Sequence, residues 1–139
     1  MPDVPDGFGG IAGLYNIAEW AAKEGKEVYI EALKSPAAFD QGKTTYYAVP
    51  AAKTLYIVSM SFIQVVNNAA DYDHHLWAAA WLYDDQDDTH VYRLSGAGGA
   101  NLTLPRPMVI PGGHTAVLSI VNQSNVNCKI QAVALGYEI

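Results

Sequence analysis

Apolar and polar residues alternate with period two along most of this chain. Residues 27–33, for example, place Val28, Ile30 and Ala32 on one face, which is the pattern of a β-strand with one buried side. Further strands are expected at residues 43–49, 55–66, 76–83, 90–94, 101–104, 108–110, 115–121 and 126–137. About eight short strands separated by frequent turn signals predict an all-β fold, a jelly-roll-like antiparallel β-sandwich.

The stretch at residues 49–66 gives the main support for this prediction. From Leu55 onward it is a long strand with Tyr56, Val58, Met60 and Phe62 on one face, and it is apolar on both faces at its start. Such a strand is expected at the centre of a sheet, because an edge strand usually carries charge or proline. The sequence VPAAKT precedes it at residues 49–54, and the similar IPGGHT at 110–115 precedes another strand. Two such corners favour a sandwich.

The first 25 residues follow a different pattern. Residues 1–10 contain two prolines and three glycines and predict an extended arm. Residues 11–24 have the 3.6-residue spacing of one short helix, which Gly25 ends. We therefore divide the chain into a docking element at 1–25 and a β-sandwich domain at 26–139.

Two interpretations of the helix remain open. Tyr15 and Trp20 could pack it on the sandwich, or the arm and helix together could dock on another subunit. In the second interpretation the partner-binding residues are Phe8, Ile11, Leu14, Tyr15 and Trp20.

The amino-acid composition limits the kinds of partner that this chain is expected to bind. The chain has 139 residues, enough for one domain, of which 50% are hydrophobic and only 16% are charged. So few charges predict that partners bury part of the surface. A net charge of -6 argues against nucleic-acid binding. No apolar run reaches the ~18 residues of a membrane span, and the N-terminus lacks the pattern of a secretory signal, so we expect no membrane association and no cleaved export signal.

A single cysteine, Cys128, excludes an internal disulfide. It lies in a predicted strand, where a free cysteine is usually a small buried hydrophobe.

Two segments contain possible metal ligands. In the loop at 67–75, Asp71, Asp73, His74 and His75 are close in sequence, but adjacent histidines on extended backbone point opposite ways. The turn at 84–88 contains Asp84, Asp85, Asp87 and Asp88, without the glycine and distal glutamate of an EF-hand. We expect two solvated loops and no cofactor; Ca²⁺, or a partner's Lys or Arg, at the acidic turn is the open alternative.

No catalytic constellation is visible. The chain has no Gly-x-Ser-x-Gly motif, and no spacing singles out two carboxylates for acid–base catalysis, so we do not expect an enzyme. A small hydrolase or isomerase on a cupin-like barrel is the weakest alternative. Nine tyrosines and three tryptophans could supply a sugar-stacking platform. Their strand spacing favours core or subunit contact.

The corners at 49–54 and 110–115, followed by a terminal hairpin that ends in ALGYEI at 134–139, resemble small jelly-roll proteins of tailed-bacteriophage virions. These are capsid decoration (cement) proteins and the base domains of head fibres. The resemblance covers residues 49–139. It implies a homotrimer on the outside of the capsid, bound to the major capsid protein, with an N-terminal arm that reaches over neighbouring subunits.

The sequence thus predicts a structural virion protein, made in the host cytoplasm and located on the capsid surface. The main alternative is a carbohydrate- or receptor-binding module of a virion or surface appendage, which would use exposed Tyr or Trp and the acidic loops.

Overall fold

The computed structural model describes residues 25–68, 70 and 76–139. Within them the chain forms eight β-strands. These are β1 (Lys26–Lys34), β2 (Gln41–Ala48), β3 (Thr54–Val66), β4 (Ala78–Asp84), β5 (Asp87–Gly96), β6 (Gly99–Pro111), β7 (Thr115–Asn122) and β8 (Cys128–Glu138). The predicted arm and helix lie outside the described residues.

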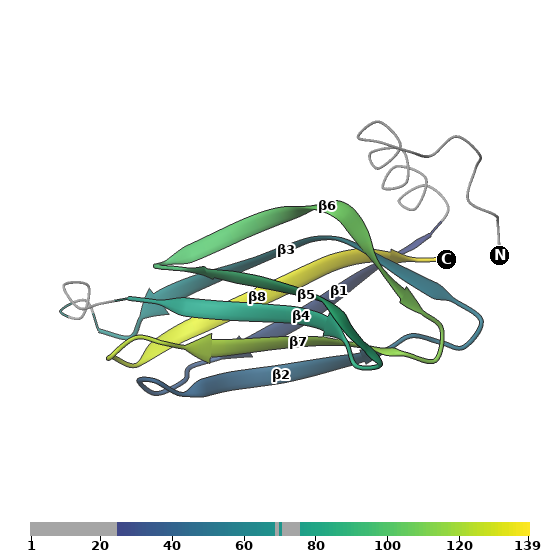
Figure 1. Cartoon of the computed structure of the whole chain (residues 1–139). Helices are drawn as coiled ribbons and strands as arrows, with labels where there is room; N and C mark the ends of the chain where they lie inside the picture. The colour runs from purple at the N-terminus through teal and green to yellow at the C-terminus, as the bar shows by residue number, and fades with distance from the viewer. Residues whose placement is uncertain (1–24, 69, 71–75) are drawn as a thin grey trace.

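The strands form two antiparallel four-stranded sheets packed face to face (Figure 1). One has the order β1-β8-β3-β6, and the other has the order β2-β7-β4-β5. Each sheet takes strands from the whole length of the chain, which is the interleaved connection of a jelly roll. The predicted all-β jelly-roll sandwich is confirmed.

Strand β3 is a central strand, as predicted, but Tyr56, Val58, Met60 and Phe62 do not share one face. A register shift between Ile57 and Ser59 places a bulge at Val58. Before the bulge Leu55 and Ile57 enter the core, and after it Met60 and Phe62 do. A bulge adds one residue to one strand and so reverses the inward parity. Tyr56 consequently packs outside the main core, against Tyr137 and Ile139.

Strand β6 also differs from the prediction. Residues 101–104 and 108–110 belong to one strand, and the glycine-rich segment 95–100 is mostly strand, because β5 runs to Gly96 and β6 begins at Gly99. The pairing with β3 is nevertheless interrupted between Thr103 and Met108, so Pro105 and Pro107 have no partner on β3. Proline is tolerated there because it lies on an edge strand and outside the hydrogen-bonded ladder. The expected interruption is therefore present in the pairing, although the strand itself continues.

The two similar corners contact each other. Gly113 N donates to Val49 O (2.9 Å), and Val49 N donates to His114 O (2.9 Å). A Cβ at Gly112 would lie 2.3 Å from Ala51 O, so a residue without a side chain is needed there. The corners thus join the β2–β3 and β6–β7 connections.

The sandwich has two distinct ends, since antiparallel strands bring their connections together in two groups. We call the end formed by residues 35–40, 97–98 and 123–127, with the starts of β4 and β8, the network end. We call the opposite end, which contains residues 49–53, 84–87, 112–114 and the C-terminus, the acidic end. In Figure 1 the C-terminus marks the acidic end.

Candidate functional site

A buried hydrogen-bond network holds the network end together. Asn122, fully buried at the end of β7, donates through Nδ2 to Ala37 O (2.9 Å) and Val126 O (2.8 Å) and lies 3.4 Å from Pro36 O. Its Oδ1 accepts from Ser124 N (2.9 Å). One side chain therefore satisfies backbone groups of both the β1–β2 and the β7–β8 connections.

Gln64 extends this network to β4 and to the β5–β6 turn. Its Nε2 donates to Ser124 Oγ (2.8 Å) and to Trp77 O (3.2 Å), and its Oε1 accepts from Gly98 N (3.3 Å). Gln64 continues the buried row of Met60 and Phe62, so the period-two alternation of β3 was the available signal. Its burial was not predicted, because a glutamine is usually exposed.

Cys128 belongs to the same region. It is fully buried, as predicted, and Gln64 Nε2 lies 3.4 Å from its Sγ. Burial raises the pKa of the thiol, and the Gln64 hydrogen bond opposes that shift. A thiol that is buried and protonated is a packing group and a poor nucleophile.

At the acidic end, the carboxylates of the β4–β5 turn are used to build the turn. Asp84 is buried; its Oδ2 lies 2.7 Å from His114 Nδ1, and its Oδ1 accepts from Gln86 N (3.0 Å). Asp85 Oδ1 accepts from Thr115 N (2.9 Å). Two of the four candidate Ca²⁺ ligands thus tie the turn to His114 and Thr115, where the corner at 110–115 meets β7.

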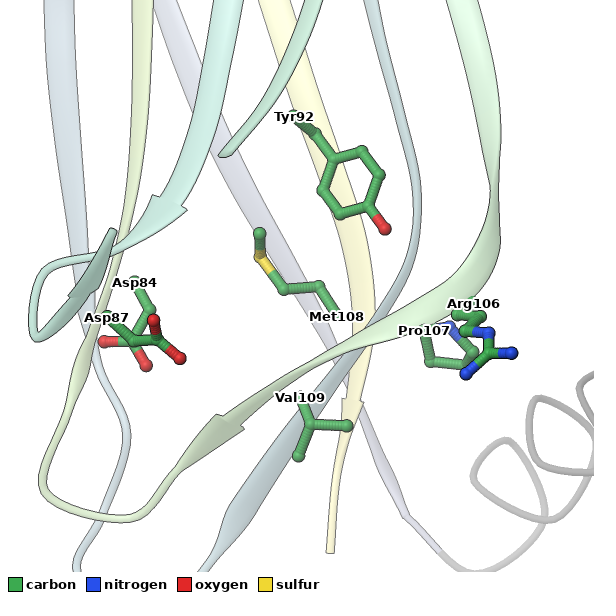
Figure 2. Close-up of a pocket in the computed structure, with 7 residues that line it drawn as sticks. All are labelled: Asp84, Asp87, Tyr92, Arg106, Pro107, Met108 and Val109. Carbon is green, nitrogen blue, oxygen red and sulfur yellow. The ribbon is translucent and has the colours of Figure 1, made fainter. Parts of the chain in front are cut away.

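A cavity of about 260 Å³ lies beside this turn (Figure 2). Asp84 and Asp87 line one side of it, and Arg106 and Pro107 on β6 line the other. Tyr92, Met108 and Val109 complete the lining. Within the described residues no three His, Cys, Asp or Glu side chains are grouped closely enough to hold a metal ion.

The acidic end also contains a perturbed tyrosine. Tyr47 Oη donates a short hydrogen bond to Glu138 Oε2. Burial and this hydrogen bond to a carboxylate raise the pKa of Tyr47 to about 12. The neutral phenol therefore persists well above neutral pH, and this contact links β2 to the end of β8.

The outer face of the sheet β1-β8-β3-β6 has many exposed apolar side chains. Register places Leu33, Gln131 and Ile63 in one row across β1, β8 and β3. The exposed apolar residues of this face are Tyr29, Leu33, Ile63, Val65 and Val109. Exposed apolar side chains gathered on one sheet face are candidates for contact with a partner; the register places the polar residues Glu31, Ser61 and Gln131 among them.

The outer face of the other sheet carries Tyr46, Trp81 and Tyr83, three of the aromatic residues that could supply a sugar-stacking platform. Tyr46 is 69% exposed and shares a row with Val117 and Tyr83. In the next row the Arg93 guanidinium lies 5.0 Å from the centre of the Trp81 ring. This cation–π contact occupies one face of Trp81.

The structure leaves several predicted site residues undescribed. Phe8, Ile11, Leu14, Tyr15 and Trp20, and the loop residues Asp71, Asp73, His74 and His75, lie outside the described residues. Asp88 lies on β5, and only its backbone is described. No helix in the described part of the chain is long and apolar enough to cross a membrane.

The sequence matches no protein-family model, and no curated protein is similar to it. Among solved structures, the CBM36-1 domain of a multidomain xylanase from the hindgut metagenome of Trinervitermes trinervoides matches with a TM-score of 0.46 and 11% identity, over 81% of this chain and 96% of that one.

Two virus particles also contain similar chains. Cowpea mosaic virus empty particles match with a TM-score of 0.47 and 13% identity, over 79% of this chain and 82% of that one. The capsid asymmetric unit of cyanophage Pam1 matches with a TM-score of 0.46 and 11% identity, over 82% and 84%. Likenesses at these scores carry no functional argument, so the jelly-roll assignment rests on the strand order of this chain.

Proposed function

We propose that this protein is a non-enzymatic structural protein of a virion, a capsid decoration protein that binds the outside of a phage capsid as a trimer and stabilises it. The observation that carries the proposal is the exposed apolar face of the sheet β1-β8-β3-β6. Leu33 and Ile63, which share a row on this face, are 46% and 55% exposed. Burying such side chains against another protein contributes roughly 25 cal/mol per Å².

The composition supports the same proposal. Only 16% of the residues are charged, and interface cores are depleted in charge and enriched in aromatic residues. Pro105 and Pro107 lie on the edge strand β6, which limits unwanted strand pairing on a crowded particle. In this proposal residues 1–25 supply a docking arm for the capsid.

Co-sedimentation with purified empty capsids of the encoding phage tests the proposal. The full chain is expected to pellet with the capsids in a saturable manner. Ile63→Lys places a charge within the exposed apolar face and is expected to weaken binding at least tenfold. Val91→Lys is the matched control, because Val91 is an exposed valine on β5 of the other sheet. Equal binding by both variants would refute a role for the apolar face.

A carbohydrate-binding module is the second candidate, and exposed Tyr46 in one row with Tyr83 is the observation that favours it. Aromatic rings stack on the apolar faces of sugars, and here Tyr46 and Tyr83 lie on one sheet face with Val117 of β7 between them. A glycan array distinguishes the two functions. Saturable binding that Tyr46→Ala abolishes would favour the module over the decoration protein.

A further inference from the structure

A row of aromatic side chains crosses the outer face of the sheet β2-β7-β4-β5. Register places Tyr46, Val117 and Tyr83 side by side on β2, β7 and β4. Val117 alternates with Ala116 and Leu118 of the core and so points outward, yet it is only 1% exposed. An outward valine that is buried leaves no crevice between the two rings. The row is therefore a flat platform, on which Tyr46 and Tyr83 stand about 10 Å apart, two strand spacings.

The next row places a cation beside this platform. Trp81 lies opposite Arg93 of the edge strand β5, and the Arg93 guanidinium is 5.0 Å from the centre of the Trp81 ring. Stacking uses the flat face of a guanidinium, whereas its N–H donors lie in its plane. The ring of Trp81 thus holds Arg93 on the face and leaves these donors available to an anion.

The surroundings of Arg93 do not supply that anion. The side chains next to Arg93 on this face, on its own strand and on β4, are all uncharged: Ala79, Trp81, Tyr83, Val91 and Ser95. Asp88 and His90 of β5, of which only the backbone is described, precede Arg93 by five and three residues, about 10 Å or more along the strand. An exposed arginine with uncharged neighbours attracts an anionic ligand to this face.

Hydroxyl groups continue the row of Trp81 in the other direction. Ser119 lies next to Trp81 on β7, and Thr44 lies next to Ser119 on β2. Thr44 Oγ1 and Ser119 Oγ are 2.6 Å apart, and either can be the donor. A hydroxyl group both donates and accepts hydrogen bonds, so this pair can exchange bonds with the hydroxyl groups of a sugar.

The two rows together match one class of ligand. Aromatic rings stack on the apolar faces of sugars, and a guanidinium binds a carboxylate through two parallel hydrogen bonds. Arg93 and Tyr83 are diagonal neighbours on β5 and β4, about 7–8 Å apart, so a sugar ring on Tyr83 can reach Arg93 with its carboxylate. The acidic side chains of a peptide would pair with Arg93 but have no ring to stack on the platform.

We infer that the outer face of the sheet β2-β7-β4-β5 binds an oligosaccharide that contains a sugar acid. Tyr46 and Tyr83 stack on the sugar rings, Arg93 binds the carboxylate, and Trp81 is a positioning residue for Arg93. This inference names the ligand class of the carbohydrate-binding function proposed above and rests on that function. It does not depend on capsid binding, which is proposed for the opposite face of the sandwich (Figure 1).

Isothermal titration calorimetry of the full chain tests the inference. The ligands are oligosaccharides of galacturonic, glucuronic, mannuronic and sialic acid, each compared with its methyl ester, which keeps the sugar rings and removes the charge. We expect saturable binding of at least one acid and about tenfold weaker binding of its ester, because a hydrogen bond to a charged group is stronger than a neutral one. Poly-glutamate supplies carboxylates without sugar rings and is expected to bind more weakly than that acid.

Matched substitutions locate the site. Arg93→Gln is expected to lower the affinity for the acidic oligosaccharide roughly 10- to 100-fold. Arg106→Gln, at the other arginine of the chain and on β6 of the opposite sheet, is expected to leave it unchanged. Tyr46→Ala should lower the affinity about tenfold, whereas Tyr29→Ala, at an exposed tyrosine of the opposite face, should have no effect. All four variants should unfold at the wild-type urea concentration, because each position is exposed.

Each outcome separates this inference from the functions proposed above. If no acid binds, the inference is overturned, and the glycan array then decides whether a neutral carbohydrate remains a ligand. Equal binding of acid and ester, or of Arg93→Gln and Arg106→Gln, would overturn the inference alone, and poly-glutamate that binds as tightly as the acids would overturn it in favour of an acidic peptide. Binding of an acid by a chain that does not co-sediment with capsids would refute the decoration function while the inference stands.

Discussion

The two ends of the sandwich are closed by different physical means. The network end uses the neutral side chains of Gln64, Asn122 and Ser124, which are buried and bonded to the backbone of several connections. The acidic end uses the close approach of two backbone corners together with the hydrogen bond between Asp84 and His114. The comparison teaches that neutral amides can fix loops without burying a charge, whereas the acidic end buries the Asp84 carboxylate, which needs His114 and Gln86 N as partners.

The largest loss of stability on substitution is expected at the network end. Asn122→Ala removes the donor to the carbonyls of Ala37 and Val126 and the acceptor for Ser124 N. Leaving these groups without partners in a buried site is expected to cost about 3 kcal/mol of unfolding free energy, measured by urea denaturation. Asn125→Ala, on the exposed side of the same loop, should cost under ~0.5 kcal/mol. Similar losses in both variants would contradict the assigned role of the network.

The next largest loss of stability is expected at the acidic end, where the backbones of the two corners approach closely. In Gly112→Ala the new Cβ would lie 2.3 Å from Ala51 O and 2.6 Å from Lys53 O, so the two corners must separate. We expect a loss of about 2–3 kcal/mol in urea denaturation. At Gly113, with a φ of 85° and open space around a Cβ, alanine should cost only ~1 kcal/mol of local strain. A larger loss at Gly113 would show that the corners are not held by close approach.

Loss of the hydrogen bond between Asp84 and His114 is expected to lower the unfolding free energy by a smaller amount. Asp84→Asn keeps an acceptor for Gln86 N but removes the charge opposite His114. We expect a loss of roughly 1–2 kcal/mol at neutral pH, because a hydrogen bond to a charged group is stronger than a neutral one. Asp87→Asn, an exposed position on the same turn, should have less effect. The unfolding midpoints of the two variants in urea check this order.

The smallest expected effect on stability comes from Tyr47 and appears only at alkaline pH. The pKa of Tyr47 is raised to about 12, so the folded state keeps its proton where the unfolded chain, with the ordinary value of 10.0, releases it. The stabilisation is complete below pH 10 and is lost as the pH rises toward 12. Urea midpoints measured from pH 9 to 11 should therefore fall less in Tyr47→Phe than in wild type. Parallel curves would exclude Tyr47 as a source of the pH dependence.

The alternation of apolar residues was enough to predict the all-β class and the position of most strands. It also predicted the buried Cys128 and the central place of β3, because burial on one side of a strand requires apolar residues at every second position. It did not reveal the bulge at Val58 or the passage of β6 through Pro105 and Pro107. Both depend on which strand lies alongside, and that information is not local.

The candidate sites were harder to predict. The acidic turn was recognised from its four aspartates, but only the structure assigned Asp84 to His114 and Asp85 to Thr115 N, from contacts 30 residues apart in the chain. The stacking of Arg93 on Trp81 was not predicted at all, because it depends on the register between β4 and β5. An arginine in an alternating strand has no sequence pattern that pairs it with a particular ring.

By itself, the sequence determined that this chain folds as an antiparallel sandwich with too few charges to cover its surface, because both properties follow from composition and short-range periodicity. The tertiary structure alone decided the strand order, the contact between the two corners and the buried amide network. These features join residues far apart in the chain, and such pairings are selected by the packing of the whole core rather than by any local preference.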